Sequence, residues 1–314
     1  MAPQPQIERF RELLSLCAQL NGDAPTLEDL RRPPWPTERR ALPEVRDLKV
    51  DGPGGPISVR LYRPEPPSRG PLPVLVYLHG GGWVVGGIEH VDEVCRELAV
   101  GAGCAVVSVG YRLAPEHPFP AAVEDAWAVL SDLTSDPERY GADPGAVAVA
   151  GESAGGNLAA VTALRARDEG VPLVHQLLVY PVTDAAMDTP SWSEYASGFG
   201  LDGAMMAAFL GMYRGDADAD DPRLSPLRAR DLAGAAPATV ITAGCDILRD
   251  EGEAYARRLA EAGVPVELRR FDDAVHSFFL LPEIFDAGRD ARAMAVRALR
   301  AAFDSTAVVE NAPR

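Results

Sequence analysis

Residues 149–156 read Val-Ala-Gly-Glu-Ser-Ala-Gly-Gly and contain the pattern G-x-S-x-G, with Ser153 at its centre. An apolar stretch typical of a strand, residues 146–151, leads into this pattern, and a helical pattern over residues 154–168 follows it. A sharp turn from strand to helix holds the central side chain in a strained position at the edge of a sheet. The Ser153 hydroxyl is therefore predicted to project into a cleft, where the helix N-terminus favours developing negative charge. A turn that merely starts a helix would show the same letters, so this pattern alone does not decide the function.

Strand and helix patterns alternate on both sides of this turn. Strands are predicted at residues 45–50, 57–62, 73–80, 104–111, 146–151, 175–182, 238–244 and 265–271. Helices are predicted at residues 88–101, 121–133, 154–168, 250–263 and 286–304. This alternation indicates an α/β fold with a mostly parallel, eight-stranded sheet and helices on both of its faces.

Two segments interrupt the alternation. Residues 1–44 are helical at first and then rich in proline, and residues 185–232 separate two strands by about 50 residues, far more than an ordinary connection. The second segment carries many apolar side chains: Trp192, Tyr195, Phe199, Met205, Met206, Phe209, Met212 and Tyr213. We expect both segments to form one cap over the carboxyl end of the sheet, where open α/β sheets bind ligands. Residues 45–184 and 233–305 would then form the core and 306–314 a tail, whereas the alternative is a surface subdomain with no role at the site.

Composition and charge exclude several classes of function. The 314 residues include 30 basic and 46 acidic side chains, which give a formal net charge of −16 at pH 7. Without a basic cluster this charge argues against nucleic-acid binding. No apolar run is long enough to span a membrane. Because charged residues interrupt the N-terminal stretch where a signal peptide would be apolar, we expect a cytoplasmic protein.

The sequence indicates neither a metal ion nor a cofactor. The four cysteines are far apart: Cys17, Cys95, Cys104 and Cys245. Because no C-x-x-C pair is present, free buried thiols are favoured over a disulfide or a zinc site. The acidic run at residues 216–221 departs from the calcium-binding EF-hand loop, since Asp221 stands at the glycine position and Leu227 at the glutamate position. We expect a solvated loop there.

A glycine-rich segment, His79-Gly80-Gly81-Gly82-Trp83, follows the predicted strand 73–80. Glycines leave backbone N–H groups unshielded, so several of them can converge on the oxyanion that forms when a carbonyl is attacked. A phosphate cradle is the alternative, but the patterns GxxxxGK[ST] and GxGxxG before a helix are absent. The segment therefore favours acyl transfer over nucleotide binding.

A serine nucleophile needs a base, and the base needs an orienting carboxylate. Among the five histidines, His276 lies just past a predicted strand and therefore at the carboxyl end of the sheet. The other four are placed less favourably: His79, His90, His117 and His175. His79 heads the glycine run and is predicted to brace that loop.

Asp246 ends another predicted strand at the same edge of the sheet. The order Ser153, Asp246, His276 is the nucleophile–acid–base order of α/β-hydrolases. Asp250 and Glu251 are alternatives for the acid, but they fall in the first turn of the next helix, where acidic residues interact with the helix dipole. A capping aspartate and a loop histidine without catalytic roles are the other interpretation of Asp246 and His276.

The chain resembles the hormone-sensitive-lipase family of α/β-hydrolases, the bacterial family IV carboxylesterases. Five segments carry the resemblance in the order of the family: HGGGW at 79–83, YRLAPEHPFPAA at 111–122, GESAGG at 151–156, DILRDEG at 246–252 and the loop of His276. The resemblance implies an α/β-hydrolase fold with a helical cap. It also implies that Ser153 is the nucleophile, Asp246 the acid and His276 the base.

The resemblance further implies an oxyanion hole built from the backbone N–H groups of Gly81, Gly82 and Ala154, with no cofactor. Three residues depart from the usual family pattern: Glu152 for aspartate or threonine, Ile247 for proline and Ser277 for glycine. None of these departures removes a catalytic group.

We therefore expect a serine carboxylesterase that cleaves short- to medium-chain acyl esters through an acyl-enzyme. Trp83, Glu152 and Phe199 are predicted to lie at the substrate pocket. The expected partner is a small-molecule ester, and a homodimer is left open. Two alternatives are an amidase or deacetylase that uses the same triad on an N-acyl or O-acetyl metabolite, and a non-catalytic small-molecule receptor.

Overall fold

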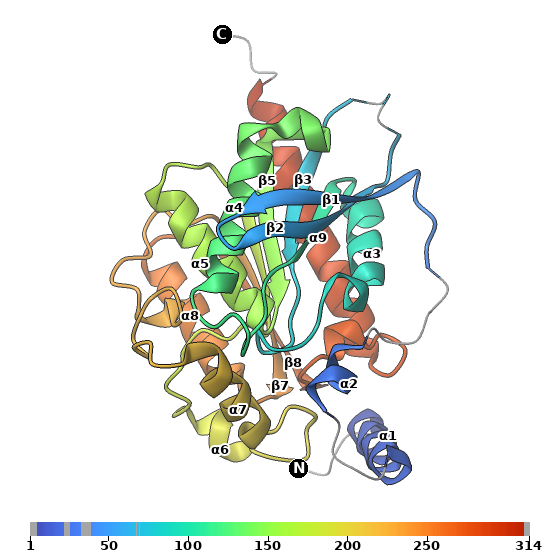
Figure 1. The fold of residues 1–314 in the computed structure, drawn as a ribbon, viewed down its shortest axis with the longest axis vertical. Helices are drawn as coiled ribbons and strands as arrows, with labels where there is room; N and C mark the ends of the chain where they lie inside the picture. Colours follow the sequence, from blue (N-terminus) through green and yellow to red (C-terminus); the bar gives the residue numbers. More distant parts are fainter. Residues whose placement is uncertain (1–4, 22–25, 33–38, 67, 69, 311–314) are drawn as a thin grey trace.

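A mixed eight-stranded sheet forms the centre of the computed structural model, which describes residues 5–21, 26–32, 39–66, 68 and 70–310 (Figure 1). The strand order is β1-β2-β4-β3-β5-β6-β7-β8. The strands are β1 (Glu44–Gly52), β2 (Gly55–Arg63), β3 (Leu72–Leu78), β4 (Ala105–Gly110), β5 (Ala142–Glu152), β6 (His175–Val179), β7 (Ala238–Cys245) and β8 (Val266–Val275). Strand β2 pairs in the antiparallel direction with β1 on one side and β4 on the other. The six strands β3 to β8 are all parallel to one another. The predicted α/β fold is confirmed.

Helices cover both faces of the sheet (Figure 1). On one face lie α3 (Asp92–Ala102) and α9 (Asp286–Glu310). On the other face lie α4 (Ala121–Ser135), α5 (Ala154–Asp168) and α8 (Arg249–Glu261). Because the central strands are covered on both sides, every residue of β6 is buried, including the polar His175 and Gln176.

Four helices lie together beyond the end of the sheet where β7 and β8 are labelled: α1 (Pro5–Asn21), α2 (Leu27–Arg31), α6 (Pro190–Glu194) and α7 (Gly203–Arg214) (Figure 1). The N-terminal segment and the 185–232 insertion contact each other, because Arg11 donates a hydrogen bond of 2.6 Å to the Gly198 carbonyl. The Arg11 guanidinium also stacks over the Phe199 ring, 4.4 Å from its centroid. Most of the proline-rich part of the N-terminal segment, residues 33–38, lies outside the described residues.

Short 3₁₀ helices complete the connections: η2 (Ile88–His90), η3 (Pro137–Tyr140), η4 (Pro226–Arg228) and η5 (Phe278–Leu280). Within the described part of the chain, no helix combines the length and the apolar character that crossing a bilayer requires. The thiols of Cys95, Cys104 and Cys245 are free. The side chain of Cys17 lies outside the described residues.

Two elements extend beyond the ranges that the sequence predicts. Strand β8 continues to Val275, four residues past its predicted end at residue 271, because an edge strand pairs on one side only and tolerates the exposed Asp272 and Asp273. Helix α9 continues to Glu310, six residues past its predicted end at residue 304. No glycine or proline lies between residues 305 and 310, so no helix-breaking residue ends α9 before Glu310.

Candidate active site

Ser153 occupies the turn between β5 and α5. Its backbone has φ 58° and ψ −121°, a strained conformation for a residue that is not glycine. The turn closes tightly on its neighbours, since a Cβ atom at Gly151 would collide with the Gly155 carbonyl and one at Gly155 with the Leu78 carbonyl. Glycines at these two positions therefore allow the close approach that the strand–turn–helix geometry requires.

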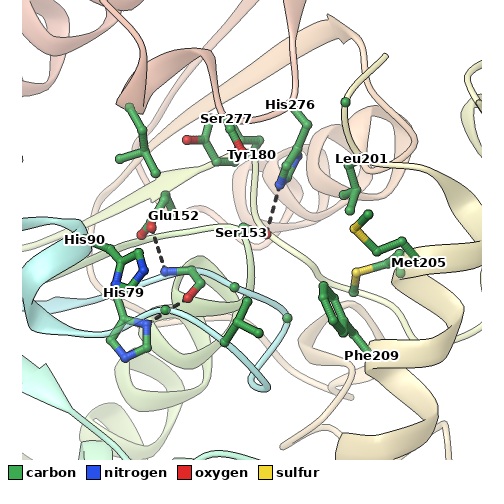
Figure 2. Close-up of a pocket in the computed structure, with 18 of the residues that line it drawn as sticks. His79, His90, Glu152, Ser153, Tyr180, Leu201, Met205, Phe209, His276 and Ser277 are labelled. Atoms are coloured by element: carbon green, nitrogen blue, oxygen red, sulfur yellow. Dashed lines mark hydrogen bonds between the residues drawn. The ribbon is translucent and has the colours of Figure 1, made fainter. Parts of the chain in front are cut away.

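The structure brings Ser153, His276 and Asp246 into one hydrogen-bonded row. Atom Nε2 of His276 lies 3.0 Å from Oγ of Ser153 (Figure 2). Atom Nδ1 of His276 lies 2.7 Å from Oδ2 of Asp246. The second carboxylate oxygen of Asp246 accepts a hydrogen bond of 3.0 Å from the Leu248 amide. All three side chains are largely shielded from solvent, with exposed fractions of 7% for Ser153, 6% for His276 and 2% for Asp246.

The loop after β8 holds His276 in place. Because β8 ends at Val275, the histidine directly follows the strand at the carboxyl edge of the sheet. The Tyr180 ring packs against the imidazole with a centroid distance of 4.6 Å. Ser277 has φ 68° and ψ 4°, the left-handed region in which glycine is favoured and other residues lose roughly 1–2 kcal/mol. With Ser277 in this conformation, His276 still reaches Ser153.

Neither alternative acid reaches the imidazole. Asp250 accepts a hydrogen bond of 2.9 Å from the Ser191 amide. Glu251 is fully buried and accepts hydrogen bonds from the Thr183 amide at 2.8 Å and the Trp192 indole at 3.1 Å. Burial raises the pKa of Glu251 to about 8. The prediction that Glu251 only interacts with the helix dipole is therefore incomplete, because this side chain anchors the start of the 185–232 insertion.

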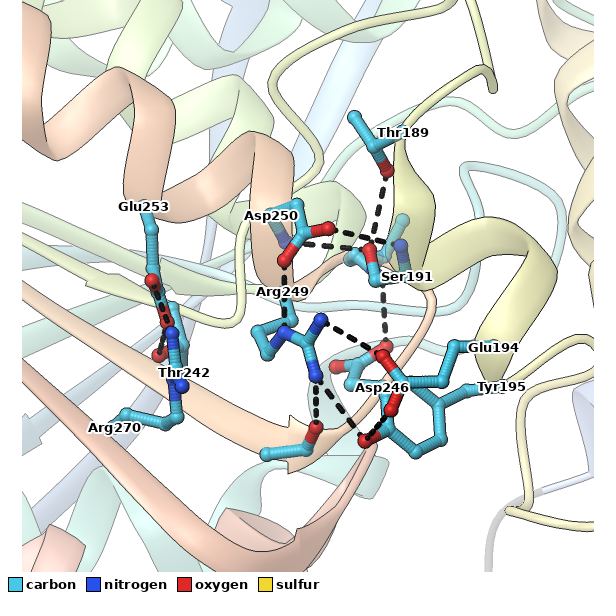
Figure 3. A network of polar contacts seen from close by, with 12 residues as sticks. Thr189, Ser191, Glu194, Tyr195, Thr242, Asp246, Arg249, Asp250, Glu253 and Arg270 are labelled. Atoms are coloured by element: carbon cyan, nitrogen blue, oxygen red, sulfur yellow. Dashed lines mark hydrogen bonds and ion pairs between the residues drawn. The ribbon is translucent and has the colours of Figure 1, made fainter.

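A polar network joins α6 to the segment that follows Asp246 (Figure 3). Arg249 donates to Glu194 and to the Tyr195 hydroxyl, both at 3.1 Å, and to the Gly244 carbonyl at 3.0 Å. The Ser191 hydroxyl donates to the Ile247 carbonyl at 2.7 Å. These contacts tie the insertion to the loop that carries the carboxylate.

The glycine-rich segment lies beside Ser153 (Figure 2). Among the described residues, none accepts a hydrogen bond from the amides of Gly81, Gly82 or Ala154. Gly82 has φ 58°, and a Cβ atom there would overlap the Phe209 ring from α7. His79 braces this loop as predicted, because its Nδ1 atom lies 2.7 Å from the Gly80 carbonyl oxygen and its ring stacks on Tyr111 at 4.1 Å. Burial lowers the pKa of His79 to about 4, so the imidazole is neutral.

A cavity of about 310 Å³ opens in front of Ser153 (Figure 2). Apolar side chains from α1 and from α7 and its N-terminal flank form one side of it: Phe10, Leu201, Met205, Met206 and Phe209. Polar side chains line another side: His79, His90, Glu152 and Ser277. Tyr180, which follows β6 at the same sheet edge, also lines the cavity and was not predicted. Its position after a buried strand could have revealed it.

Of the three residues predicted to lie at the substrate pocket, Glu152 lines this cavity, whereas Trp83 and Phe199 are not among its lining residues. Trp83 is fully buried and stacks on Tyr213 with a centroid distance of 4.3 Å. Phe199 packs edge-on against Tyr195 at 5.0 Å and under the Arg11 guanidinium. Both rings are used in packing contacts instead, Trp83 against Tyr213 of the insertion and Phe199 within the insertion and against Arg11. In the described ranges, no group of three or more His, Cys, Asp or Glu side chains is arranged to hold a metal ion.

Comparisons with known proteins agree with this geometry. Residues 75–280 match a family described as alpha/beta hydrolase fold. The chain is 46% identical over 278 residues to esterase LipI of Mycobacterium tuberculosis, covering 87% of this chain and 86% of that protein. It is 41% identical over 253 residues to an ethyl acetate hydrolase of Pseudomonas putida, covering 79% of each.

Solved structures show the same likeness. An ester hydrolase from the metagenome of Lake Arreo superposes with a TM-score of 0.88 at 39% identity, over 96% of this chain and 99% of that one. The esterase of Pyrobaculum calidifontis superposes with a TM-score of 0.80 at 40% identity, over 94% and 93%. The chain therefore belongs to the hormone-sensitive-lipase-like carboxylesterases of the α/β-hydrolase superfamily.

Proposed function

We propose that this protein is a serine carboxylesterase that hydrolyses short- to medium-chain acyl esters through a covalent acyl-enzyme. The observation that carries the proposal is the row Asp246–His276–Ser153, with contacts of 2.7 and 3.0 Å, at the base of a largely apolar cavity. The names of the relatives, which include an esterase and an ethyl acetate hydrolase, support ester bonds as the target.

In the first step, Ser153 attacks the ester carbonyl while Nε2 of His276 takes the hydroxyl proton. Asp246 accepts the Nδ1–H hydrogen bond, which holds the imidazole in the required tautomer and stabilises the imidazolium. His276 then gives the proton to the departing alkoxide, and the alcohol leaves. Water activated by the same imidazole hydrolyses the acyl-enzyme, which releases the acid and restores Ser153.

Gly81, Gly82 and Ala154 supply the oxyanion hole in this proposal. Their amides stand on two chain segments beside Ser153, and no described residue accepts a hydrogen bond from them. The amide of Ala154 is also the first of α5, so the helix dipole adds positive potential at the developing charge. Preorganised amides of this kind stabilise the tetrahedral transition state more than the ground-state carbonyl.

The cavity supports small esters as substrates. Its volume of about 310 Å³ stands at the lower end of the usual range for ligand pockets. Its apolar side, formed by Leu201, Met205, Met206 and Phe209, suits an alkyl chain. We propose that α1, α2, α6 and α7 act together as the cap over this cavity, since Phe10 of α1 lines it alongside the α7 residues. The cytoplasm as compartment and a homodimer stay predictions.

The test is hydrolysis of p-nitrophenyl acetate, butyrate and hexanoate by the purified protein and by Ser153→Ala. The variant is expected to lose about 10⁴-fold or more in kcat, because the oxyanion hole alone retains only a small residual catalysis. A fluorophosphonate probe should label the wild-type protein and not the variant. Parent-like rates in Ser153→Ala, or equal labelling of both proteins, would refute the proposal. A parallel anilide assay with the same acyl groups separates an esterase from an amidase.

A further inference from the structure

The peptide group between His79 and Gly80 is held at both of its ends. The Tyr111 hydroxyl donates to the His79 carbonyl at 2.6 Å. The Gly80 amide donates to Oε1 of Glu152, also at 2.6 Å (Figure 2). Because a peptide group is planar and trans, these two contacts on opposite sides fix the orientation of the whole group.

The next two peptide groups are held through their carbonyls. Nδ1–H of His79 donates to the Gly80 carbonyl at 2.7 Å. The amides of Val84 and Val85 donate to the Gly81 carbonyl at 3.1 and 2.9 Å. In a trans peptide the N–H points away from the C=O, so these contacts also fix the directions of the Gly81 and Gly82 amides. The Gly81 amide is therefore oriented by the hydrogen bond to the Gly80 carbonyl, and the Gly82 amide by the hydrogen bonds to the Gly81 carbonyl.

Glu152 stands apart from the other partners because it shares a peptide bond with Ser153. Its side chain is 2% exposed and lies under the glycine-rich loop, where a Cβ atom at Gly80 would come within 2.9 Å of both the Glu152 carbonyl and Oε1. The Tyr77 hydroxyl lies 3.4 Å from Oε2, and the Tyr77 ring belongs to the buried cluster on the face of the sheet that α3 and α9 cover. Glu152 thus links Ser153 to the glycine-rich loop, and the amides of that loop must lie at a set distance from the Ser153 hydroxyl.

We infer that Glu152 is a positioning residue that sets the amides of Gly81 and Gly82 relative to Ser153 Oγ. The inference rests on the proposed esterase function. The link requires a hydrogen-bond acceptor at Oε1, and a negative charge is not needed. Burial raises the pKa of Glu152 to about 8, so the neutral acid predominates at pH 7, and a glutamine amide is its close mimic.

Three variants test the inference. Glu152→Leu removes the hydrogen-bond acceptor for the Gly80 amide, and Glu152→Gln keeps it. Glu152→Asp keeps a carboxyl group on a side chain that is one methylene shorter, so its oxygen lies farther from that amide. Loss of one oxyanion donor lowers kcat roughly 10²–10³-fold. In Glu152→Leu the amides of Gly81 and Gly82 are still present but no longer held in position, so we expect a smaller fall in kcat of about 10–100-fold. The KM for p-nitrophenyl butyrate should change little, because the ground-state carbonyl depends less on these amides.

A trifluoromethyl ketone inhibitor gives a second readout, because it forms a tetrahedral oxyanion adduct with the serine. Its affinity for Glu152→Leu should fall in parallel with kcat, and Glu152→Gln should recover most of both losses. Glu253→Leu is the matched control, since Glu253 is also a buried carboxylate, and it is bonded at 2.6 Å to Arg270 of the edge strand β8 and not to the glycine-rich loop. This control should lower thermal stability without lowering kcat.

Three results would overturn the inference while Ser153→Ala remains inactive. One is a folded Glu152→Leu protein with wild-type kcat. Another is a Glu152→Gln protein as impaired as the leucine variant, which would show that the acceptor is not what matters. The third applies if Glu152→Leu does not fold: a Glu152→Asp protein whose kcat and inhibitor affinity both equal those of the wild type would refute the role of Glu152. An active Ser153→Ala protein would instead refute the proposed function itself.

Discussion

Atom Nδ1 of His276 lies 2.7 Å from Oδ2 of Asp246, and the carboxylate is held in turn by the Leu248 amide at 3.0 Å. A carboxylate can only accept hydrogen bonds, so this contact places the ring proton on Nδ1. The lone pair of Nε2 then faces the Ser153 hydroxyl at 3.0 Å. The acid thus acts on the serine through the tautomer of the imidazole.

An asparagine at position 246 should therefore impair catalysis with little change in fold. Its amide group can donate to Nδ1 and favour the tautomer that carries its proton on Nε2, which cannot accept the serine proton. For Asp246→Asn we expect kcat on p-nitrophenyl butyrate to fall about 10⁴-fold. Asp250→Asn is the matched control, because Asp250 contacts Ser191 instead of the imidazole, and it should keep at least a tenth of the activity. Equal losses in the two variants would contradict the assignment of the acid.

Phe209 should limit the length of the acyl or alcohol chain. The ring comes from α7, covers Gly82 and lines the cavity. Replacing it by alanine enlarges the apolar side, and each additional buried methylene contributes about 0.8 kcal/mol, or roughly fourfold in kcat/KM. In Phe209→Ala we therefore expect the ratio of kcat/KM for hexanoate over acetate to rise several-fold. Met212→Ala on the same helix does not alter the cavity lining and should leave the ratio as it is. An unchanged ratio in Phe209→Ala would exclude this residue as a determinant of chain length.

Arg31 should dock α2 onto the core. Its guanidinium donates to the carbonyls of Val84 and Ala114 at 2.9 and 2.8 Å and pairs with Glu116 at 2.7 Å. Hydrogen bonds of a charged group contribute about 1.5–3 kcal/mol, so Arg31→Ala should lower the free energy of unfolding by about 2 kcal/mol in urea titrations.

Arg32→Ala is the control for this measurement. Arg32 follows α2 and is exposed, and among the described residues its guanidinium pairs with Glu28 and Asp29 of α2 at 3.7 and 3.5 Å, which are contacts that contribute little. Its removal should change the free energy of unfolding by less than about 0.5 kcal/mol. If both variants lose the same stability, the contacts of Arg31 with the core do not carry the docking.

His175 should make the protein less stable in mild acid. Burial lowers its pKa to about 4, whereas in the unfolded chain the pKa is about 6.5. Between these values the unfolded chain binds a proton that the folded protein does not, so the free energy of unfolding falls as the pH drops from 6.5 towards 4. The side chain lies 3.0 Å from the Thr239 hydroxyl, a contact that glutamine can replace.

The corresponding measurement is urea unfolding of the wild type and His175→Gln at pH 7.5 and 5.0. The loss of stability between these pH values should be smaller in the variant by roughly 2 kcal/mol. The pKa of histidine in the unfolded chain, about 6.5, stands about 1.5 pH units above 5.0, and each pH unit corresponds to about 1.4 kcal/mol. Equal losses in the two proteins would show that His175 takes up no additional proton on unfolding.

Local patterns in the sequence predicted the elements and their order. Strands and helices were found because burial on both sides of a sheet leaves continuous apolar runs, and because glycine-rich turns mark their ends. The ends of β8 and α9 were missed, since edge strands and helix ends depend little on apolar pattern. Ser153, Asp246 and His276 could be found because each lies at the carboxyl end of a parallel strand, and such ends meet at one edge of the sheet.

Contacts between distant segments were decided by the tertiary structure alone. The sequence marks Trp83 and Phe199 as apolar, but only the packing of the insertion turns them away from the cavity. The sequence marks Glu152 and Glu251 as acidic, but only the fold buries them and brings Oε1 of Glu152 to the Gly80 amide, 72 positions away along the chain. The physical reason is that strand, helix and turn preferences act over a few neighbouring residues, whereas side-chain burial and hydrogen-bond partners depend on every segment that packs around them.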